Sequence, residues 1–152
     1  MYVETGYIDA NDDVAFRTHA EACNCFGHTY KQWFKAMAKH PVDPELNIWF
    51  PKLYNNPDWD NSFSDGEEIL YERSKHDNAG HFDGFLNAYR REKDIFKRLV
   101  FAHERASSGA LMYRFKGLYV IDAEESIRIR IVTYRRKSKR VKTYAPVRGS
   151  LS

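Results

Sequence analysis

The sequence is poor in cysteine: Cys23 and Cys25 are the only two among its 152 residues. Two cysteines one residue apart cannot build a disulfide framework, so the folded chain must rely on an apolar core. Long apolar runs are missing too, and none approaches the roughly 20 residues that a helix needs to cross a bilayer. The opening residues, MYVETGYIDANDD, lack the basic start and the apolar segment of a secretory signal. We therefore expect a cytoplasmic protein that has no membrane partner.

The chain does contain enough apolar material for a core. Hydrophobic residues make up 43% of it, aromatic residues 15% and charged residues 30%. This composition excludes wholesale disorder and the collagen-like and low-complexity classes. A globular chain of this length buries about 70% of the surface that it exposes when unfolded. We expect one domain over residues 1–152, with a helical part at 12–40 and a mainly β part at 47–145.

Hydrophobic periodicity predicts the order of the elements. Apolar residues at intervals of three or four predict one helix from Asp12 or Asp13 to Cys23 and another over 30–37. A third, short helix is predicted at 81–91. Runs of β-branched and aromatic residues predict strands at 1–11, 47–50, 68–74, 98–102, 111–121 and 127–132. Strands that follow a helical first third indicate the α+β class, with a curled antiparallel sheet or small β-barrel flanked by N-terminal helices.

Charge is divided unevenly along the chain. Residues 1–89 hold 7 Lys and Arg against 15 Asp and Glu, whereas residues 90–152 hold 17 against 6. No acid follows Glu125, although nine Lys and Arg do. This asymmetry favours a polyanionic partner for the basic half; the alternative is that the two halves neutralise each other within the fold. The residues predicted to bind phosphates are Arg114, Lys116, Arg128, Arg130, Arg135, Arg136, Lys137, Lys139, Arg140 and Lys142.

A segment rich in both aromatic and polar residues begins at Trp49. Within residues 49–61, aromatic rings are interleaved with Lys, Asn and Asp. Stacking of a nucleobase on an aromatic ring is worth about 1–3 kcal/mol, and an extruded base also needs amide or carboxylate groups at its hydrogen-bonding edge. The predicted base pocket consists of Trp49, Tyr54, Asn56, Asp58, Trp59 and Asp60. The alternative is that Trp49 is a core residue and that Tyr54 and Trp59 pin a long loop.

Two sets of residues carry metal-ligating atoms at close spacing. The first set is His19, Cys23, Cys25 and His28. Cys-x-Cys is not the usual zinc pattern and no second ligand pair follows downstream, so two small buried thiols at a helix end are favoured. The second set is Asp58, Asp60, Asp65 and Glu67. A solvated acidic loop explains it better than a cation site, and we expect neither a metal nor a cofactor.

Signs of catalysis are weak. The chain has no Gly-x-Ser-x-Gly elbow, no Gly-rich phosphate loop and no His-Glu-x-x-His motif. His76, Asp77 and Asn78, with His81, faintly suggest a ββα-metal nuclease, but a matching His or Asn on a following helix is not evident. We expect a binding protein, and not an enzyme.

Three blocks of sequence, taken together, resemble a known family. They are Phe26–Ala36 (FGHTYKQWFKA), Ile48–Leu53 (IWFPKL), and Arg98–Ala102 (RLVFA) with Tyr113–Ser126 (YRFKGLYVIDAEES), followed by Tyr134-Arg135-Arg136 and Arg140–Tyr144 (RVKTY). Their order resembles the SRA-like modules of the PUA superfamily, which are attached to bacterial nucleases of modification-dependent restriction systems. The resemblance spans about residues 14–145.

This resemblance implies a curled β-barrel flanked by helices that reads a flipped, modified cytosine in duplex DNA. By position, the RFKGLY run would be a barrel strand, and the loop after IWFPKL would form a pocket wall. The chain departs from the pattern in lacking a nuclease domain, so cleavage would need a fused or partner domain.

We therefore expect a non-catalytic module that binds DNA, with RNA as an open alternative. A second hypothesis is an interaction protein of phage or mobile-element type, which binds a nuclease or other nucleic-acid-handling enzyme through its basic face. A small metal-dependent nuclease is the third.

Overall fold

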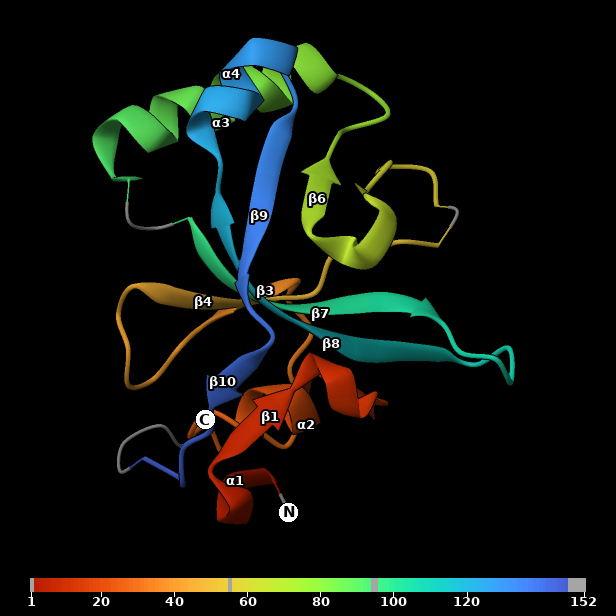
Figure 1. Cartoon of the computed structure of the whole chain (residues 1–152), viewed down its shortest axis with the longest axis vertical. Helices are drawn as coiled ribbons and strands as arrows, with labels where there is room; N and C mark the ends of the chain where they lie inside the picture. Colours follow the sequence, from red (N-terminus) through yellow and green to blue (C-terminus); the bar gives the residue numbers. More distant parts are fainter. Residues whose placement is uncertain (1, 55, 94–95, 148–152) are drawn as a thin grey trace.

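The computed structural model describes residues 2–54, 56–93 and 96–147. Its central feature is a curled, mixed β-sheet (Figure 1). Along the main path the strands follow the order β3 (Met37–Lys39), β4 (Leu46–Trp49), β7 (Lys97–Arg105), β8 (Leu111–Ile121), β9 (Val132–Ser138), β6 (Ile69–Glu72) and β5 (Ser62–Phe63). A further strand, β2 (Ala15–Phe16), pairs with β8. Strands β4 and β7 are parallel, and the other pairs of this sheet are antiparallel.

Shorter elements surround the sheet. Strands β1 (Tyr7–Asp9) and β10 (Arg140–Lys142) form a separate antiparallel pair. The helical elements are α1 (Tyr2–Thr5), the 3-10 turn η1 (Ala10–Asp12), α2 (His19–Asn24), the 3-10 turn η2 (Asp65–Glu67), α3 (Asn78–Arg91) and α4 (Ala123–Ile129). Helices α3 and α4 lie together at one end of the molecule, whereas α1, α2, β1 and β10 lie at the other (Figure 1). None of the described helices combines the length and the apolar character that a membrane crossing requires.

Apolar side chains cover both faces of the sheet, because successive residues of a strand point to opposite sides. Ile48 and Phe50 belong to one core, which also contains Cys23 of α2. Trp49, between them, belongs to the other core, together with Phe82 of α3. The alternation therefore fixes two neighbouring aromatic rings on opposite faces at the end of β4.

The α+β class and the curled sheet are confirmed. The path of described strands begins at β3 and ends at β5, which do not pair with each other, so within these residues the sheet curls without closing into a barrel. Four predicted strands, at 47–50, 68–74, 98–102 and 111–121, and the helix at 81–91 are confirmed with small shifts of their bounds. The strand predicted at 1–11 is confined to β1 and follows α1.

The predicted helix from Asp12 or Asp13 to Cys23 is wrong in its first half. Asp13 has a φ of 56°, in the left-handed region. The next residues form β2, which pairs with β8. The helix begins only after Thr18, whose side-chain oxygen accepts from the N–H of Glu21 at 3.1 Å. Pairing with a distant strand overrides the apolar spacing that predicted the longer helix.

The helix predicted at 30–37 is wrong. Trp33 stacks on Tyr30 with 4.6 Å between ring centroids, and Tyr30 stacks on His28 at 4.2 Å. Met37 already lies in β3, where it pairs with Trp49. The aromatic stripe therefore reflects a stack of rings packed on the first core.

The strand predicted at 127–132 is also wrong. Asp122 accepts at Oδ1 from the N–H of Glu125 at 3.0 Å and so caps α4. The helix ends at Arg130, which has a φ of 57°. Ile127 is 50% exposed, although the alternating pattern placed it in the core. A helix-capping aspartate, which the prediction did not weigh, decides this segment.

Irregular pairing bends the long β7–β8 hairpin. The register shifts between Val100 and Phe101, and a second shift lies where β8 pairs with β9. Nearby, Gly117 has a φ of +120°, and a Cβ at this position would lie 2.3 Å from the backbone oxygen of Ser138. Because bulges increase the bend and twist of a strand, the curl of the sheet depends on glycine here.

Gly117→Ala should lower the free energy of unfolding by about 1–3 kcal/mol, because the left-handed backbone and the close backbone oxygen both oppose a side chain. Gly84→Ala in α3 is the control. A Cβ there meets no atom within 4 Å, and Ala is favoured over Gly in a helix by about 1 kcal/mol. Urea unfolding of the two variants and the wild type measures both effects. Equal stability of Gly117→Ala and the wild type would contradict this role of Gly117.

Candidate functional site

A slot of about 90 Å³ opens where the end of β4 meets the β5–β6 hairpin. We call it the aromatic slot; its lining residues are Ala36, Trp49, Phe50, Pro51, Lys52, Trp59, Asn61 and Glu72. The segment before β3, the end of β4, the loop that follows and strand β6 each contribute to this wall. The curl of the sheet therefore brings together residues that are far apart in the sequence.

Hydrogen bonds to Asn56 hold the loop that carries Trp59. The Oδ1 of the buried Asn56 accepts from the N–H of Asp58 at 3.1 Å and from the N–H of Trp59 at 2.8 Å. Lys75 donates from Nζ to the backbone oxygen of Asn56 at 2.6 Å. Trp59 also forms an isolated antiparallel bridge with Ser74. These contacts fix the backbone and leave the half-buried indole at the rim of the slot.

Two polar side chains face the slot. Asn61 donates from Nδ2 to the backbone oxygen of Lys52 at 3.1 Å, while its buried Oδ1 has no hydrogen-bond partner among the described residues. The side chain of Glu72 is 16% exposed, and its Oε1 lies 3.3 Å from Nε2 of His81. That imidazole meets the ring of Trp59 edge to face, with 5.2 Å between centroids. A planar ligand in the slot would lie among aromatic rings, an amide and a carboxylate.

The slot must widen before it can hold a pyrimidine. A cavity of about 150 Å³ accommodates a benzene ring, whereas the slot measures about 90 Å³. Trp49 and Phe50 are 5% and 3% exposed and belong to the two cores, so they form a fixed wall. Lys52 is exposed and Trp59 is half-buried. Rotation of these two side chains at the rim is the adjustment that the packing allows.

The residues predicted for the base pocket lie in different places. Trp49 and Trp59 line the aromatic slot. Asn56 holds the loop, Tyr54 packs on His103 with 4.9 Å between ring centroids, and Asp58 lies 3.0 Å from His76 at the surface. The pocket assignment of these residues stays a prediction.

Asp60 faces away from the aromatic slot. It lines a second hollow, of about 330 Å³, together with Tyr71. Tyr71 and Glu72 are neighbours in β6 and point to opposite faces, and Glu72 lines the slot together with Asn61. Sequence reasoning did not select Asn61 or Glu72 for the pocket. Asn61 follows Trp59 by two residues in the aromatic and polar segment, which is the signal that could have selected it, whereas the position of Glu72 depends on the pairing of the β5–β6 hairpin.

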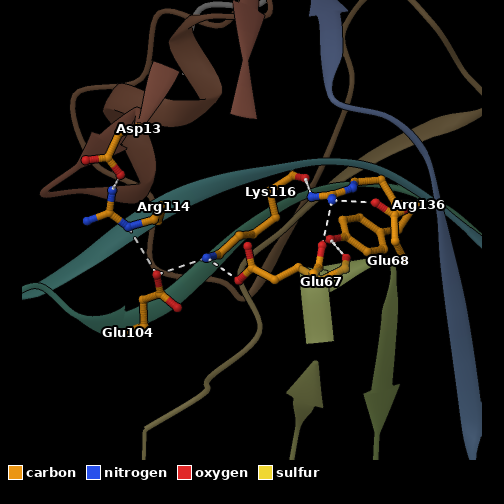
Figure 2. Close-up of polar contacts among 9 residues, drawn as sticks. Asp13, Glu67, Glu68, Glu104, Arg114, Lys116 and Arg136 are labelled. Carbon is orange, nitrogen blue, oxygen red and sulfur yellow. Dashed lines mark hydrogen bonds and ion pairs between the residues drawn. The ribbon is translucent and has the colours of Figure 1, made fainter. Parts of the chain in front are cut away.

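Several of the predicted phosphate-binding cations form ion pairs with acidic residues. Arg114 bonds to Asp13 and Glu104, and Lys116 lies between Glu104 and Glu67 at 3.1 and 2.6 Å (Figure 2). The side chain of Lys116 is only 6% exposed. Because a buried charge is tolerated only when paired, these contacts fix the position of β8 relative to its acidic neighbours.

Arg136 is held on several sides, and its side chain is 6% exposed. It donates to the backbone oxygens of Lys116 and Gly66 at 3.1 and 2.9 Å and to the carboxylate of Glu68 at 2.7 Å (Figure 2). Its guanidinium also lies 5.9 Å from the ring centroid of Tyr119. The hydrogen bond from Arg136 lowers the pKa of the Glu68 carboxyl group. Arg136 thus ties the turn of the β5–β6 hairpin to β8 and β9.

The remaining predicted cations are more exposed. Four of them form ion pairs, which are Arg128–Glu125, Arg130–Asp83, Arg135–Asp122 and Arg140–Asp9. Lys142 lies 5.0 Å from the ring centroid of Tyr144. Lys137 and Lys139 are exposed, and their ammonium groups form no ion pair within the described part of the chain. Internal neutralisation therefore involves many of these cations, and their contact with phosphates stays a prediction.

The two cysteines are core residues. Cys23 and Cys25 are free and buried. Burial raises the pKa of both thiols to about 12, so they remain protonated at neutral pH, whereas zinc binds the thiolate. In the part of the chain that the structure describes, no three His, Cys, Asp or Glu side chains converge in a way that could hold a metal ion.

Comparison with known proteins gives an independent line of argument. The model of the SET and RING associated domain family matches residues 1–143. Among solved structures, the chain is similar to the 5-hydroxymethylcytosine-specific restriction enzyme AbaSI, with 32% sequence identity and a TM-score of 0.81. The match covers 96% of this chain and 45% of AbaSI, so the chain spans less than half of that enzyme. No curated protein sequence matches the chain.

Arg136→Lys should lower the free energy of unfolding by about 1–2 kcal/mol, because one ammonium cannot reproduce the forked bonds to two carbonyls and a carboxylate. Arg135→Lys on the same strand is the matched control. Arg135 is exposed and pairs with Asp122, and exposed pairs are worth about 0–1 kcal/mol. Chemical denaturation compares both variants with the wild type. A stability of Arg136→Lys no lower than that of Arg135→Lys would refute the structural role.

Proposed function

Because the chain belongs to the SET and RING associated (SRA) domain family, we propose that it binds duplex DNA and holds a modified cytosine, extruded from the helix, in the aromatic slot. AbaSI is named for its specificity for 5-hydroxymethylcytosine, and its similarity extends over nearly all of this chain. That similarity supports a modified cytosine as the ligand class. The chain would act as a reading module in the cytoplasm.

The observation that carries this proposal is the presence of aromatic rings and a carboxylate in one slot. An extruded base is held by stacking and by hydrogen bonds to its Watson–Crick edge. Trp59 supplies a ring at the rim, and the Glu72 carboxylate can accept from the exocyclic amino group of cytosine. Asn61 adds an amide oxygen that has no partner among the described residues. A carboxylate disfavours thymine, which has no amino group to donate.

The proposed role is recognition without cleavage. The match covers 45% of a restriction enzyme, which leaves room in that enzyme for a separate cutting domain. Cleavage of DNA would then require a nuclease that is fused to this chain or bound to it. Incubation of the chain with modified duplex and magnesium, manganese or zinc should leave the DNA intact.

Trp59→Ala should weaken binding to a modified duplex about 5- to 100-fold, because base stacking contributes about 1–3 kcal/mol. Glu72→Gln should have a similar effect, since the neutral amide oxygen of Gln is a weaker acceptor for the amino group of cytosine than the charged carboxylate of Glu. Binding to plain duplex should change little in both, so that the preference for modified DNA is lost. Fluorescence anisotropy with matched plain, methylated and hydroxymethylated duplexes measures this, and Asp60→Asn, on the other face of the hairpin, is the control.

Folded Trp59→Ala and Glu72→Gln variants that keep the full preference would show that the slot is not the base pocket. A wild-type protein that binds no duplex at moderate salt, but recovers a stoichiometric protein partner, would favour the interaction-protein hypothesis instead.

The exposed ammonium groups of Lys137 and Lys139 are the simplest candidates for phosphate contacts. Replacing both with Ala should reduce the slope of log affinity against log salt concentration by about two, because each phosphate contact releases about one counterion. The loss should be equal for plain and modified duplexes. An unchanged slope would place the phosphate contacts elsewhere on the protein.

A further inference from the structure

A hollow of about 260 Å³ opens between β10 and the strands β4, β7 and β8. We call it the leucine hollow, because Leu46, Leu99 and Leu118 form its apolar wall. All three belong to the first core or pack against it. Among the described residues, β10 pairs with β1 and with no strand of the large sheet. The curled sheet therefore leaves its core open here, and the leucine hollow shares no lining residue with the aromatic slot.

The charged side chains of the leucine hollow have one sign. Arg140 and Lys142 line it, whereas no Asp or Glu of the described residues does. Arg140 is already paired with Asp9 at 3.0 Å. Lys142 is exposed, and its ammonium forms no ion pair within the residues that the structure describes. An apolar wall beside an unpaired cation suits a ligand that has an apolar body and a negative charge.

His40 adds a buried hydrogen-bond donor at the same place. It lines the leucine hollow and is 5% exposed. Its Nδ1 accepts from the N–H groups of Val42 and Asp43 at 3.0 and 2.9 Å, so the proton of the neutral ring is on Nε2. Burial lowers the pKa of His40 to about 4, which keeps the ring neutral at pH 7. This Nε2 has no hydrogen-bond partner among the described residues.

The two donors lie against the same aromatic ring. The Nζ of Lys142 is 5.0 Å from the ring centroid of Tyr144, and the imidazole of His40 meets that ring edge to face with 4.9 Å between centroids. Buried polar groups are nearly always hydrogen-bonded, so the missing partner of His40 indicates a place for a further acceptor. A carboxylate is an acceptor for both kinds of donor.

We propose that the leucine hollow binds a small apolar carboxylic acid. The apolar body of the ligand would pack on the three leucines, and its carboxylate would accept from Lys142, with His40 as a second donor. A benzene ring fits a cavity of about 150 Å³, so about 260 Å³ has room for one ring and a short acidic arm. This site is separate from the proposed DNA site, because the two share no lining residue.

Phenylacetate is the probe, since it joins one phenyl ring to one carboxylate. Two matched compounds separate its parts: phenylethanol has the ring without the charge, and acetate has the charge without the ring. Titrations of the nitrogen-15-labelled protein, followed by NMR, compare their affinities. With phenylacetate at up to about 10 mM, we expect saturable shifts at the amides of the three leucines and at Nε2–H of His40. Phenylethanol should bind about 5-fold more weakly, and acetate should cause no shifts.

Lys142→Gln should weaken phenylacetate binding about 5-fold and leave phenylethanol binding unchanged, because the ammonium meets only the carboxylate. Lys93→Gln is the matched control. Lys93 is also exposed and also lies over a tyrosine ring, that of Tyr89 at 5.8 Å, but it does not line the leucine hollow. Since both lysines are exposed, both variants should remain folded, which circular dichroism checks.

Absence of shifts with phenylacetate would overturn the site. Shifts confined to the aromatic slot would overturn it as well, because the probe would then occupy the base pocket. Equal affinities for phenylacetate and phenylethanol, or an unchanged affinity of Lys142→Gln, would refute an acid as the ligand class. Shifts that depend on protein concentration, with no compound added, would make a second copy of the chain the occupant and also refute it. The preference for modified DNA is measured separately, so the proposed function stands or fails independently.

Discussion

The structure depends on buried ion pairs of the basic second half of the chain, formed mainly with acidic residues of the first half. Lys116 is buried between Glu67 and Glu104, and Arg136 holds Glu68 and the backbone around it. A charge removed from water without a partner is strongly unfavourable, so each of these cations accepts few alternative positions. These contacts therefore hold the turn between β5 and β6 against β8 and β9.

The same contacts position the candidate site. Asn61 and Glu72 belong to the β5–β6 hairpin, and Arg136 fixes the turn of that hairpin through Gly66 and Glu68. Residues predicted to bind phosphates therefore support the side chains that would meet a base. Under the proposed function, ion pairs inside the fold therefore fix the positions of the side chains that recognise DNA.

The sequence predicts the long strands well and the short elements poorly. Runs of apolar and aromatic residues define β7 and β8 by themselves, because each strand buries side chains on both of its faces. The segment at 127–132 shows the opposite case, since the capping hydrogen bond that Glu125 donates to Asp122 outweighs the alternation of apolar residues. Of the residues that line the slot, Trp49 and Trp59 are predicted from the mixture of aromatic and polar residues at 49–61 alone. The place of Glu72 in the slot could not be predicted in this way, because it depends on the pairing of β6 with β9.

Net charge along a sequence also differs from the charge that a partner would meet. The basic half has a large excess of Lys and Arg, yet Lys116 and Arg136 are buried and paired. The acidic half, in contrast, contains the segment 22–42 without any acid, and Lys31 and Lys35 are exposed there, beside the slot. These exposed cations therefore belong to the half of the chain whose total charge is negative. The exposure and pairing of individual cations, and not the net charge summed over a segment, determine where a polyanion can approach.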